Sequence, residues 1–298
     1  MKHFLALLFV LLITSCFGNK AVFENPPKQT EEIAIIEDVI EIIETPSIAE
    51  PPQPPKDNAT KISLGEDGTL TDDGISITTE IIYDEAFDHS SFNDLLKKHV
   101  SLYGNVDYSS FKSDSKVLQS YITLLKTYQP NDTWSKSDKL AYWINSYNAL
   151  TIDLILRNYP TESIKDIKDP WDQRLWKFGD KWQNLNDIEH EILRKMNEPR
   201  IHFAIVCASI SCPKLQNKAF TASNLEEQLT NATKEFITDK TKNELSKDYI
   251  KLSKIFKWFK KDFEQNGSLI DFLNQYADIS ISSKAKKSFM DYNWDLND

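Results

Sequence analysis

The segment that most constrains the fold is DKLAYWINSYNALTIDLILRNYP, which begins at Asp138 and ends at Pro160. Its apolar residues surround nearly the whole circumference of a helix, so a helix here must be buried on all sides. Ser135, three residues before Asp138, predicts the start of the helix, and the proline predicts its end. The rest of the chain must therefore provide a shell around this helix.

Two amides interrupt the apolar helix. Asn145 and Asn148 lie three residues apart and therefore on one face. A buried amide needs hydrogen-bond partners. Either the two amides hold the helix against neighbouring backbone, or they line a pocket as polar groups.

A second apolar run stands in EPRIHFAIVCASISCPKL, residues 198–215. Several β-forming residues in succession, bounded by turn-forming residues, predict a buried strand over residues 201–207. Residues 208–213 would then form the loop that leaves the strand.

The remaining patterns complete an α+β prediction, a small β-sheet packed by several helices in one domain over residues 84–298. The spacing of apolar residues predicts further helices, KFGDKW predicts a hairpin, and a strand is expected over residues 249–252. The expected helices cover residues 87–103, 115–128, 186–194, 224–238 and 268–277.

The chain begins with the features of an exported lipoprotein. Lys2 and His3 precede a short apolar run that ends in Ile-Thr-Ser-Cys, which predicts a signal peptide over residues 1–16. The last four residues resemble the bacterial lipobox, which implies lipidation of Cys16 and attachment to a membrane. By resemblance to sorting rules, Phe17 after the cysteine favours the outer membrane of the cell envelope. Residues 17–83, rich in proline and acidic residues, are expected to form a mostly disordered tether.

Charge and glycine content exclude several functions. The net charge of −10 argues against nucleic acid as a partner. With only 7 glycines, the chain has neither a GxxxxGK[ST] nor a GxGxxG phosphate-binding pattern. We expect no cofactor.

Four segments resemble, in this order, the motifs of the domain of unknown function 547 family. They are AYWINSYNALTI, NLNDIEHEILR, EPRIHFAIVCASISCPKL and LSKIFKWFKKDF. The resemblance implies no agreed activity, although many bacterial members resemble exported lipoproteins. A weaker resemblance to transglutaminase-like and papain-like hydrolases places Asn145 where those enzymes have a nucleophilic cysteine. On that resemblance either the site is inactive or the thiol has moved to Cys207.

The two cysteines of the second run allow four interpretations. Cys207 and Cys212 can close a disulfide in an oxidising compartment, or both can remain unpaired, with Cys207 a small buried apolar residue. Cys207 can instead be a nucleophile that His190 or His202 activates and that Asn145 or Glu189 orients. In a regular strand, however, His202 and Cys207 would point to opposite faces. The fourth interpretation is a metal site, but HxxxxCxxxxC is not a standard zinc spacing, and we expect no metal.

Two functions follow as hypotheses. The first is a non-catalytic module that binds a peptide, glycan or protein of the envelope in a pocket between the Asn145 helix, the His190 helix and the 208–213 loop. The second is a cysteine-dependent hydrolase or acyltransferase that acts on peptide or cell-wall amide bonds. The polar side chains expected to contribute to binding are Asn148, Glu189, Arg194, Arg200, Ser209 and Ser211.

Overall fold

The computed structural model describes residues 85–298. The predicted signal peptide, the lipidation site Cys16 and the tether all lie outside the described residues. Within residues 85–298, no helix combines the length and the apolar composition needed to cross a membrane.

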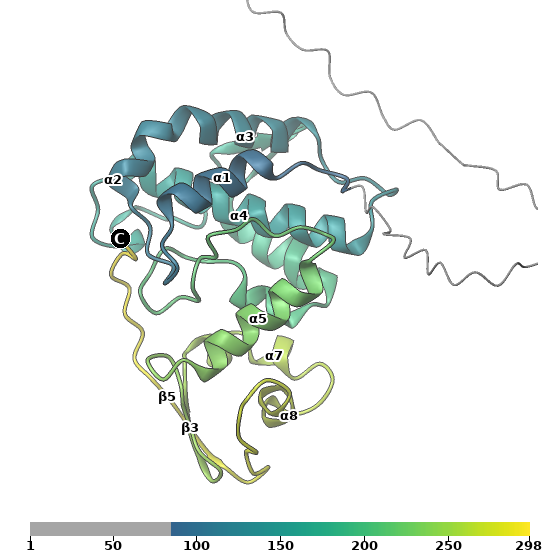
Figure 1. Ribbon diagram of the computed structural model, residues 1–298, viewed down its shortest axis with the longest axis vertical. Helices are drawn as coiled ribbons and strands as arrows, with labels where there is room; N and C mark the ends of the chain where they lie inside the picture. Colours follow the sequence, from purple (N-terminus) through teal and green to yellow (C-terminus); the bar gives the residue numbers. More distant parts are fainter. Residues whose placement is uncertain (1–84) are drawn as a thin grey trace, which may run out of the picture. The chain divides into compact units, whose positions relative to one another are not determined.

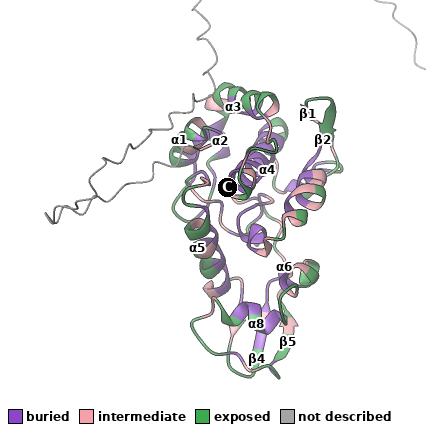
Figure 2. Ribbon diagram, turned by 90° about the vertical axis from the view of Figure 1, so that its right-hand side faces the viewer, coloured by how far each residue is buried: buried purple, intermediate pink, exposed green. Residues whose placement is uncertain are grey.

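The long apolar helix is present and lies at the centre of one core. Helix α4 spans Lys136–Asn158, and Ser135 Oγ accepts a hydrogen bond from the Asp138 backbone nitrogen at 3.0 Å. Every residue from 140 to 156 is buried (Figure 2). The prediction of a helix buried on all sides is confirmed.

Three N-terminal helices cover one side of α4. Helices α1 (Ser90–His99) and α3 (Ser115–Thr127) lie above it in Figure 1, joined by α2 (Tyr108–Phe111) and a 3₁₀ turn, η1 (Lys112–Asp114). Each of the two longer helices turns its apolar face inward, as the apolar spacing predicts. The prediction for residues 115–128 is confirmed nearly to the residue, whereas the helix expected over 87–103 is shorter at both ends.

The segment after α4 contains the predicted hairpin. After the 3₁₀ turn η2 (Ile164–Asp166), strands β1 (Trp176–Phe178) and β2 (Lys181–Gln183) pair antiparallel, with Gly179 in the turn at a φ of 55°. The helix expected over residues 186–194 is a π-helix, η3 (Asp187–Ile192), followed by a 3₁₀ turn, η4 (Leu193–Met196).

The strand predicted over residues 201–207 is wrong. A 3₁₀ helix, η5 (Pro199–Phe203), begins there, with Glu198 accepting a hydrogen bond from the Arg200 backbone nitrogen, and irregular backbone follows. The run is buried, but its backbone hydrogen bonds go to a side chain of α4 and not to a neighbouring strand. Asn148 accepts a hydrogen bond from Val206 N at 3.0 Å and donates one to Ala204 O at 2.9 Å. The argument from strand alternation that separated His202 from Cys207 therefore does not apply.

A second, smaller core lies around Phe203. It contains helix α5 (Leu225–Thr238), a sheet of order β3-β4-β5 and three short helices. Strands β3 and β4 pair antiparallel, and β4 and β5 pair parallel. The bounds are β3 (Glu244–Leu245), β4 (Tyr249–Leu252), α6 (Ile255–Trp258), α7 (Lys260–Phe263), α8 (Leu269–Asn274) and β5 (Lys286–Phe289). The strand expected over residues 249–252 and the helix expected over 224–238 are confirmed; the helix expected over 268–277 is shorter.

The segment after β5 runs back across the first core. Its backbone pairs with three separate parts of the chain. Figure 1 shows the course of the segment as a yellow trace that ends at the C-terminus. The hydrogen bonds are Ser211 N to Asn293 O, Ile210 N to Asp295 O, Leu296 N to Glu162 O, Asn297 N to Ala208 O and Val106 N to Asn297 O. Helices and two small sheets thus form one α+β domain, as predicted.

Candidate functional site

A cavity of about 290 Å³ lies beside the long helix. Its lining comes from α4, from η3, from the loop that holds both cysteines, from α6 and from the segment after β5. These include the three segments between which the sequence analysis expected a pocket. Five of its fourteen lining residues carry a Tyr, Trp or Phe ring, namely Tyr147, Trp171, Trp258, Phe259 and Trp294.

Glu189 brings a carboxyl group into this cavity. It is 8% exposed, and its Oε2 accepts a hydrogen bond from the Tyr147 hydroxyl at 3.1 Å. Burial raises the pKa of Glu189 to about 7, although the hydrogen bond from Tyr147 and the charge of Arg194 act in the opposite direction. The carboxyl group is therefore divided between its protonated and ionised forms near neutral pH.

An ion-pair network lies behind two residues of the cavity lining, His190 and His202. Arg194 donates through Nε and Nη2 to the two carboxylate oxygens of Asp262, at 2.6 and 2.9 Å. His202 Nε2 donates to Asp262 Oδ2 at 2.8 Å, and its ring stacks on Phe259 at 3.9 Å between centroids. Arg194 Nη1 also donates to His190 Nδ1 at 2.9 Å.

The protonation states in this network follow from its geometry. Burial alone would raise the pKa of Asp262, but the hydrogen bonds from His202 and Arg194 outweigh burial and hold that pKa far below its usual value. Burial lowers the pKa of His202, and burial together with the charge of Arg194 lowers the pKa of His190. Both imidazoles are therefore neutral at pH 7, and Asp262 carries the negative charge.

Cys207 and Cys212 form a disulfide with their Cα atoms 6.3 Å apart, and both residues line the cavity. The Tyr292 hydroxyl lies 3.4 Å from the sulfur of Cys207 and 3.2 Å from that of Cys212. Ser209 Oγ lies 3.3 Å from the Cys207 sulfur. In residues 85–298, neither sulfur is hydrogen-bonded to a histidine.

Asn145 and Asn148 of α4 lie outside the cavity lining and bond to backbone. Asn145 donates to Phe220 O at 2.7 Å and accepts from Phe220 N at 2.9 Å. Asn148 likewise donates to Ala204 O and accepts from Val206 N. Their amides hold two loops against the helix, which is the first of the two interpretations given above.

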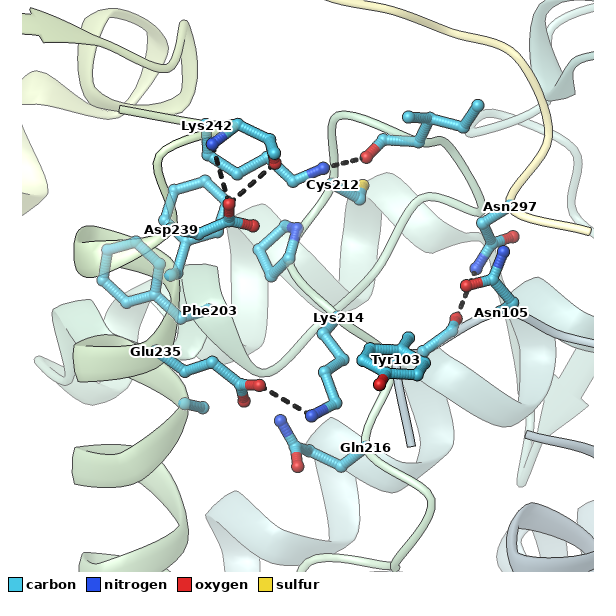
Figure 3. A pocket seen from close by; sticks show the side chains of 16 residues that line it. Tyr103, Asn105, Phe203, Cys212, Lys214, Gln216, Glu235, Asp239, Lys242 and Asn297 are labelled. Atoms are coloured by element: carbon cyan, nitrogen blue, oxygen red, sulfur yellow. Dashed lines mark hydrogen bonds and ion pairs between the residues drawn. The ribbon is translucent and has the colours of Figure 1, made fainter. Parts of the chain in front are cut away.

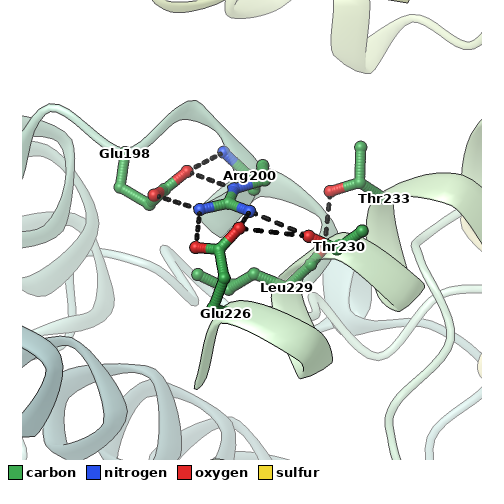
Figure 4. A network of polar contacts seen from close by, with 6 residues as sticks. All are labelled: Glu198, Arg200, Glu226, Leu229, Thr230 and Thr233. Carbon is green, nitrogen blue, oxygen red and sulfur yellow. Dashed lines mark hydrogen bonds and ion pairs between the residues drawn. The ribbon is translucent and has the colours of Figure 1, made fainter. Parts of the chain in front are cut away.

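Arg200 and Ser211 also form hydrogen bonds that join segments of the fold. Arg200 bonds the carboxylates of Glu198 and Glu226 and the Thr230 hydroxyl, which ties η5 to α5 (Figure 4). Hydrogen bonds from Arg200 to Glu198, and next to Glu226, hold the pKa of the guanidinium above its usual value. Ser211 donates no bond into the cavity in the structure, since its Oγ accepts from Asn293 N at 2.8 Å.

A second cavity, of about 330 Å³, lies on the other side of the cysteine loop (Figure 3). Cys212 and Pro213 line both cavities. Its two nearest cations are already bonded, Lys214 to Glu235 at 2.6 Å and Lys242 to the carbonyl of Ile210. Within the described part of the chain, no group of three or more His, Cys, Asp or Glu side chains is placed to hold a metal ion.

Sequence reasoning missed four contributors to the site, namely Tyr147, Asp262, Tyr292 and Trp294. Asp262 stands in LSKIFKWFKKDF, a segment with four lysines. Its position between Phe259 and Phe263 carried the signal, because it places one carboxylate on the apolar side of a short helix. Tyr292 and Trp294 reach the site only through the return of the segment after β5, which no local pattern indicates.

The fold and the site define an α+β domain with an aromatic-walled cavity beside a disulfide. Residues 131–237 match the family model described as "Protein of unknown function, DUF547". The match includes the first three of the four motif segments, and LSKIFKWFKKDF lies beyond it. No curated protein and no solved structure matches the chain.

Proposed function

We propose that residues 85–298 form a binding module whose ligand occupies the aromatic cavity. The observation that carries the proposal is the composition of the cavity: five Tyr, Trp and Phe rings around about 290 Å³, with the carboxyl group of Glu189, the amide of Asn186 and the imidazoles of His190 and His202 among its polar groups. Small-molecule sites are typically apolar hollows with few, well-placed polar groups.

The lining favours a ligand that has an apolar face and a hydrogen-bonding edge. Trp294 lies against Trp171 at 5.7 Å and against Trp258 at 5.8 Å between ring centroids, which creates flat surfaces. Glu189 can accept a hydrogen bond when ionised and donate one when protonated. A sugar residue or an amide-bearing fragment of an envelope glycan or peptide fits this description.

Titration of the full-length chain with soluble cell-wall fragments, followed by tryptophan fluorescence, tests the proposal. We expect saturable binding and a loss of roughly tenfold in affinity for Trp294→Ala, as for an aromatic residue at the centre of a contact. Trp182→Ala is the matched control, because Trp182 is 50% exposed on β2 and does not line the cavity. Absence of saturation, or equal loss in both variants, would contradict the proposal.

We further propose that the chain is a lipoprotein of the cell envelope, anchored through Cys16 to the outer membrane. Support comes from the signal-peptide pattern and the lipobox in the sequence. Labelling of growing cells with an alkyne fatty acid should mark the wild-type chain and Cys207→Ser but not Cys16→Ser. Label on Cys16→Ser would contradict the anchor at this position.

A cysteine-dependent hydrolase is the second proposal. It is favoured by one observation, that Cys207, His190 and His202 line the same cavity. It requires a reduced Cys207 and a histidine brought to its sulfur. Reaction of the reduced chain with a peptidyl chloromethyl ketone, lost in Cys207→Ser and in His190→Ala, would support it. Labelling that persists in His190→Ala and His202→Ala would oppose it.

A further inference from the structure

The disulfide is placed where a small molecule can reach it. Cys207 is partly exposed and Cys212 is 6% exposed, and both line the aromatic cavity. The sulfur of Cys207 is therefore the more accessible of the two. A cross-link that only stabilised the loop would not need to face a cavity of this size.

Two hydrogen-bond donors contact the sulfur of Cys212, the more buried of the two cysteines. Cys212 Sγ accepts from the Cys207 backbone nitrogen at 3.0 Å and from the Tyr292 hydroxyl at 3.2 Å. Donors to a sulfur stabilise its thiolate and so lower the pKa of the thiol. A thiol of lower pKa is the better leaving group in thiol–disulfide exchange.

We propose that Cys207 and Cys212 form a thiol–disulfide exchange site that reacts with a low-molecular-weight thiol entering the aromatic cavity. The thiolate of the incoming molecule attacks Cys207 Sγ, and a new S–S bond forms as the bond to Cys212 breaks. Cys212 departs as a thiolate, stabilised by Tyr292 and by the Cys207 backbone nitrogen.

A second molecule of the thiol completes the reaction. It attacks the sulfur of the first molecule in the mixed disulfide and releases Cys207 as a thiolate. Both cysteine thiolates then take up the protons that the two incoming thiols gave up. In balance, two thiols are oxidised to one disulfide, and the protein disulfide is reduced by two electrons to two thiols.

Glutathione redox buffers test this with the full-length chain carrying Cys16→Ser, in which Cys207 and Cys212 are the only cysteines. After acid quenching and alkylation, mass spectrometry gives the reduced fraction over time. We expect the disulfide to reach equilibrium with the buffer in the folded protein. A disulfide that stays oxidised in reduced glutathione until the chain is unfolded would show a purely structural cross-link and overturn the proposal.

Two sets of variants test the roles of the individual groups. Tyr292→Phe should slow reduction roughly tenfold, because one donor to the leaving sulfur is lost. Tyr249→Phe, whose hydroxyl bonds Ser288 at 2.6 Å on the sheet, should react like the wild type. An unchanged rate in Tyr292→Phe would contradict the role of this hydroxyl.

Single-cysteine variants show which of the two sulfurs a glutathione molecule in the cavity can reach, because in this reaction the remaining cysteine thiolate attacks oxidised glutathione. With oxidised glutathione, Cys212→Ser should form a mixed disulfide at Cys207 rapidly, whereas Cys207→Ser should leave Cys212 unmodified over the same time. Preferred modification of Cys212 would overturn the assignment. The proposed binding module is tested separately, since its fluorescence titration is carried out on the oxidised protein.

Discussion

The buried carboxyl group of Glu189 makes the stability of the fold depend on pH. Its pKa is about 7 in the folded chain because it is buried, whereas an unfolded chain would titrate near 4.5. Since the folded state holds the proton more tightly, stability is highest below the unfolded pKa and decreases as pH rises from 4.5 to 7. The difference between the folded and unfolded pKa values lowers the free energy of unfolding by about 3 kcal/mol at high pH.

Glu189→Gln should therefore remove most of this pH dependence. We expect the variant and the wild type to differ little at pH 5, and the variant to be more stable by about 2 kcal/mol at pH 8. Urea unfolding of the full-length chain at both pH values measures the difference. Glu191→Gln is the matched control, because Glu191 is exposed and pairs with Lys195. A wild-type stability that does not fall between pH 5 and 8 would contradict the burial of an ionisable Glu189.

Asp262 binds two side chains, Arg194 and His202, of which His202 lines the cavity. Replacing it with asparagine leaves Arg194 without its carboxylate, and the loss of hydrogen bonds to a charged group in a partly buried ion pair costs about 2 kcal/mol. We expect Asp262→Asn to lower the free energy of unfolding by about that amount in urea denaturation. Glu264→Gln, which removes only a surface pair with Lys260 at 3.6 Å, should change it by less than about 0.5 kcal/mol. Equal effects would mean that the network does not stabilise the site.

At the scale of elements, α4 provides hydrogen-bond partners to buried backbone groups that a neighbouring strand would provide in a sheet. Through two amides it satisfies backbone groups of residues 204, 206 and 220 that would otherwise be unpaired in the interior. A buried backbone group that loses its partner costs about 1–3 kcal/mol.

Asn148→Ala should accordingly destabilise the fold by about 3 kcal/mol, since it leaves both Val206 N and Ala204 O without a side-chain partner. Chemical denaturation measures the loss, and hydrogen exchange at Val206 should become faster. Asn158→Ala is the control, because Asn158 donates only to Leu154 O of its own helix. Unchanged exchange at Val206 would show that the amide does not hold the loop.

The same contacts explain what the sequence could predict. The helices over 115–127 and 136–158, the hairpin and β4 form because of local spacing and local turns, and all were predicted. The run at residues 201–207 has the composition of a strand, but short apolar runs do not identify their partner. Here the partner is the amide of Asn148, more than fifty residues earlier. The cavity was expected between the correct segments, whereas Asp262, Tyr292 and Trp294 come from elements distant in sequence.

At the scale of the whole domain, the segment after β5 joins parts that are distant in sequence. Residues 293–297 pair with residues 106, 162, 208, 210 and 211. They also carry Trp294 into the cavity wall, next to the ring of Tyr292. The site is therefore complete only when this segment is in place.

Deletion of residues 293–298 should lower the stability of the domain by about 5 kcal/mol, because five backbone hydrogen bonds are lost at about 1 kcal/mol each. Thermal unfolding of the full-length and shortened chains measures it. Deletion of Asp298 alone should cost less than about 1 kcal/mol, because its bonds to Asn105 and Tyr159 are exposed. If deletion of Asp298 alone lowered the stability as much as deletion of residues 293–298, the backbone pairing of this segment would not be what stabilises the domain.

The return of this segment also determines when the protein can acquire its site during biosynthesis. Helices α1 to α4 can form from local contacts while the chain is still being made, but the backbone nitrogen of Val106 lacks its acceptor, Asn297 O, until residue 297 has left the ribosome. A chain exported in an unfolded state would meet the same delay on the far side of the membrane. The cysteines at 207 and 212 would then face the oxidising compartment before Tyr292 and Trp294 arrive to cover them.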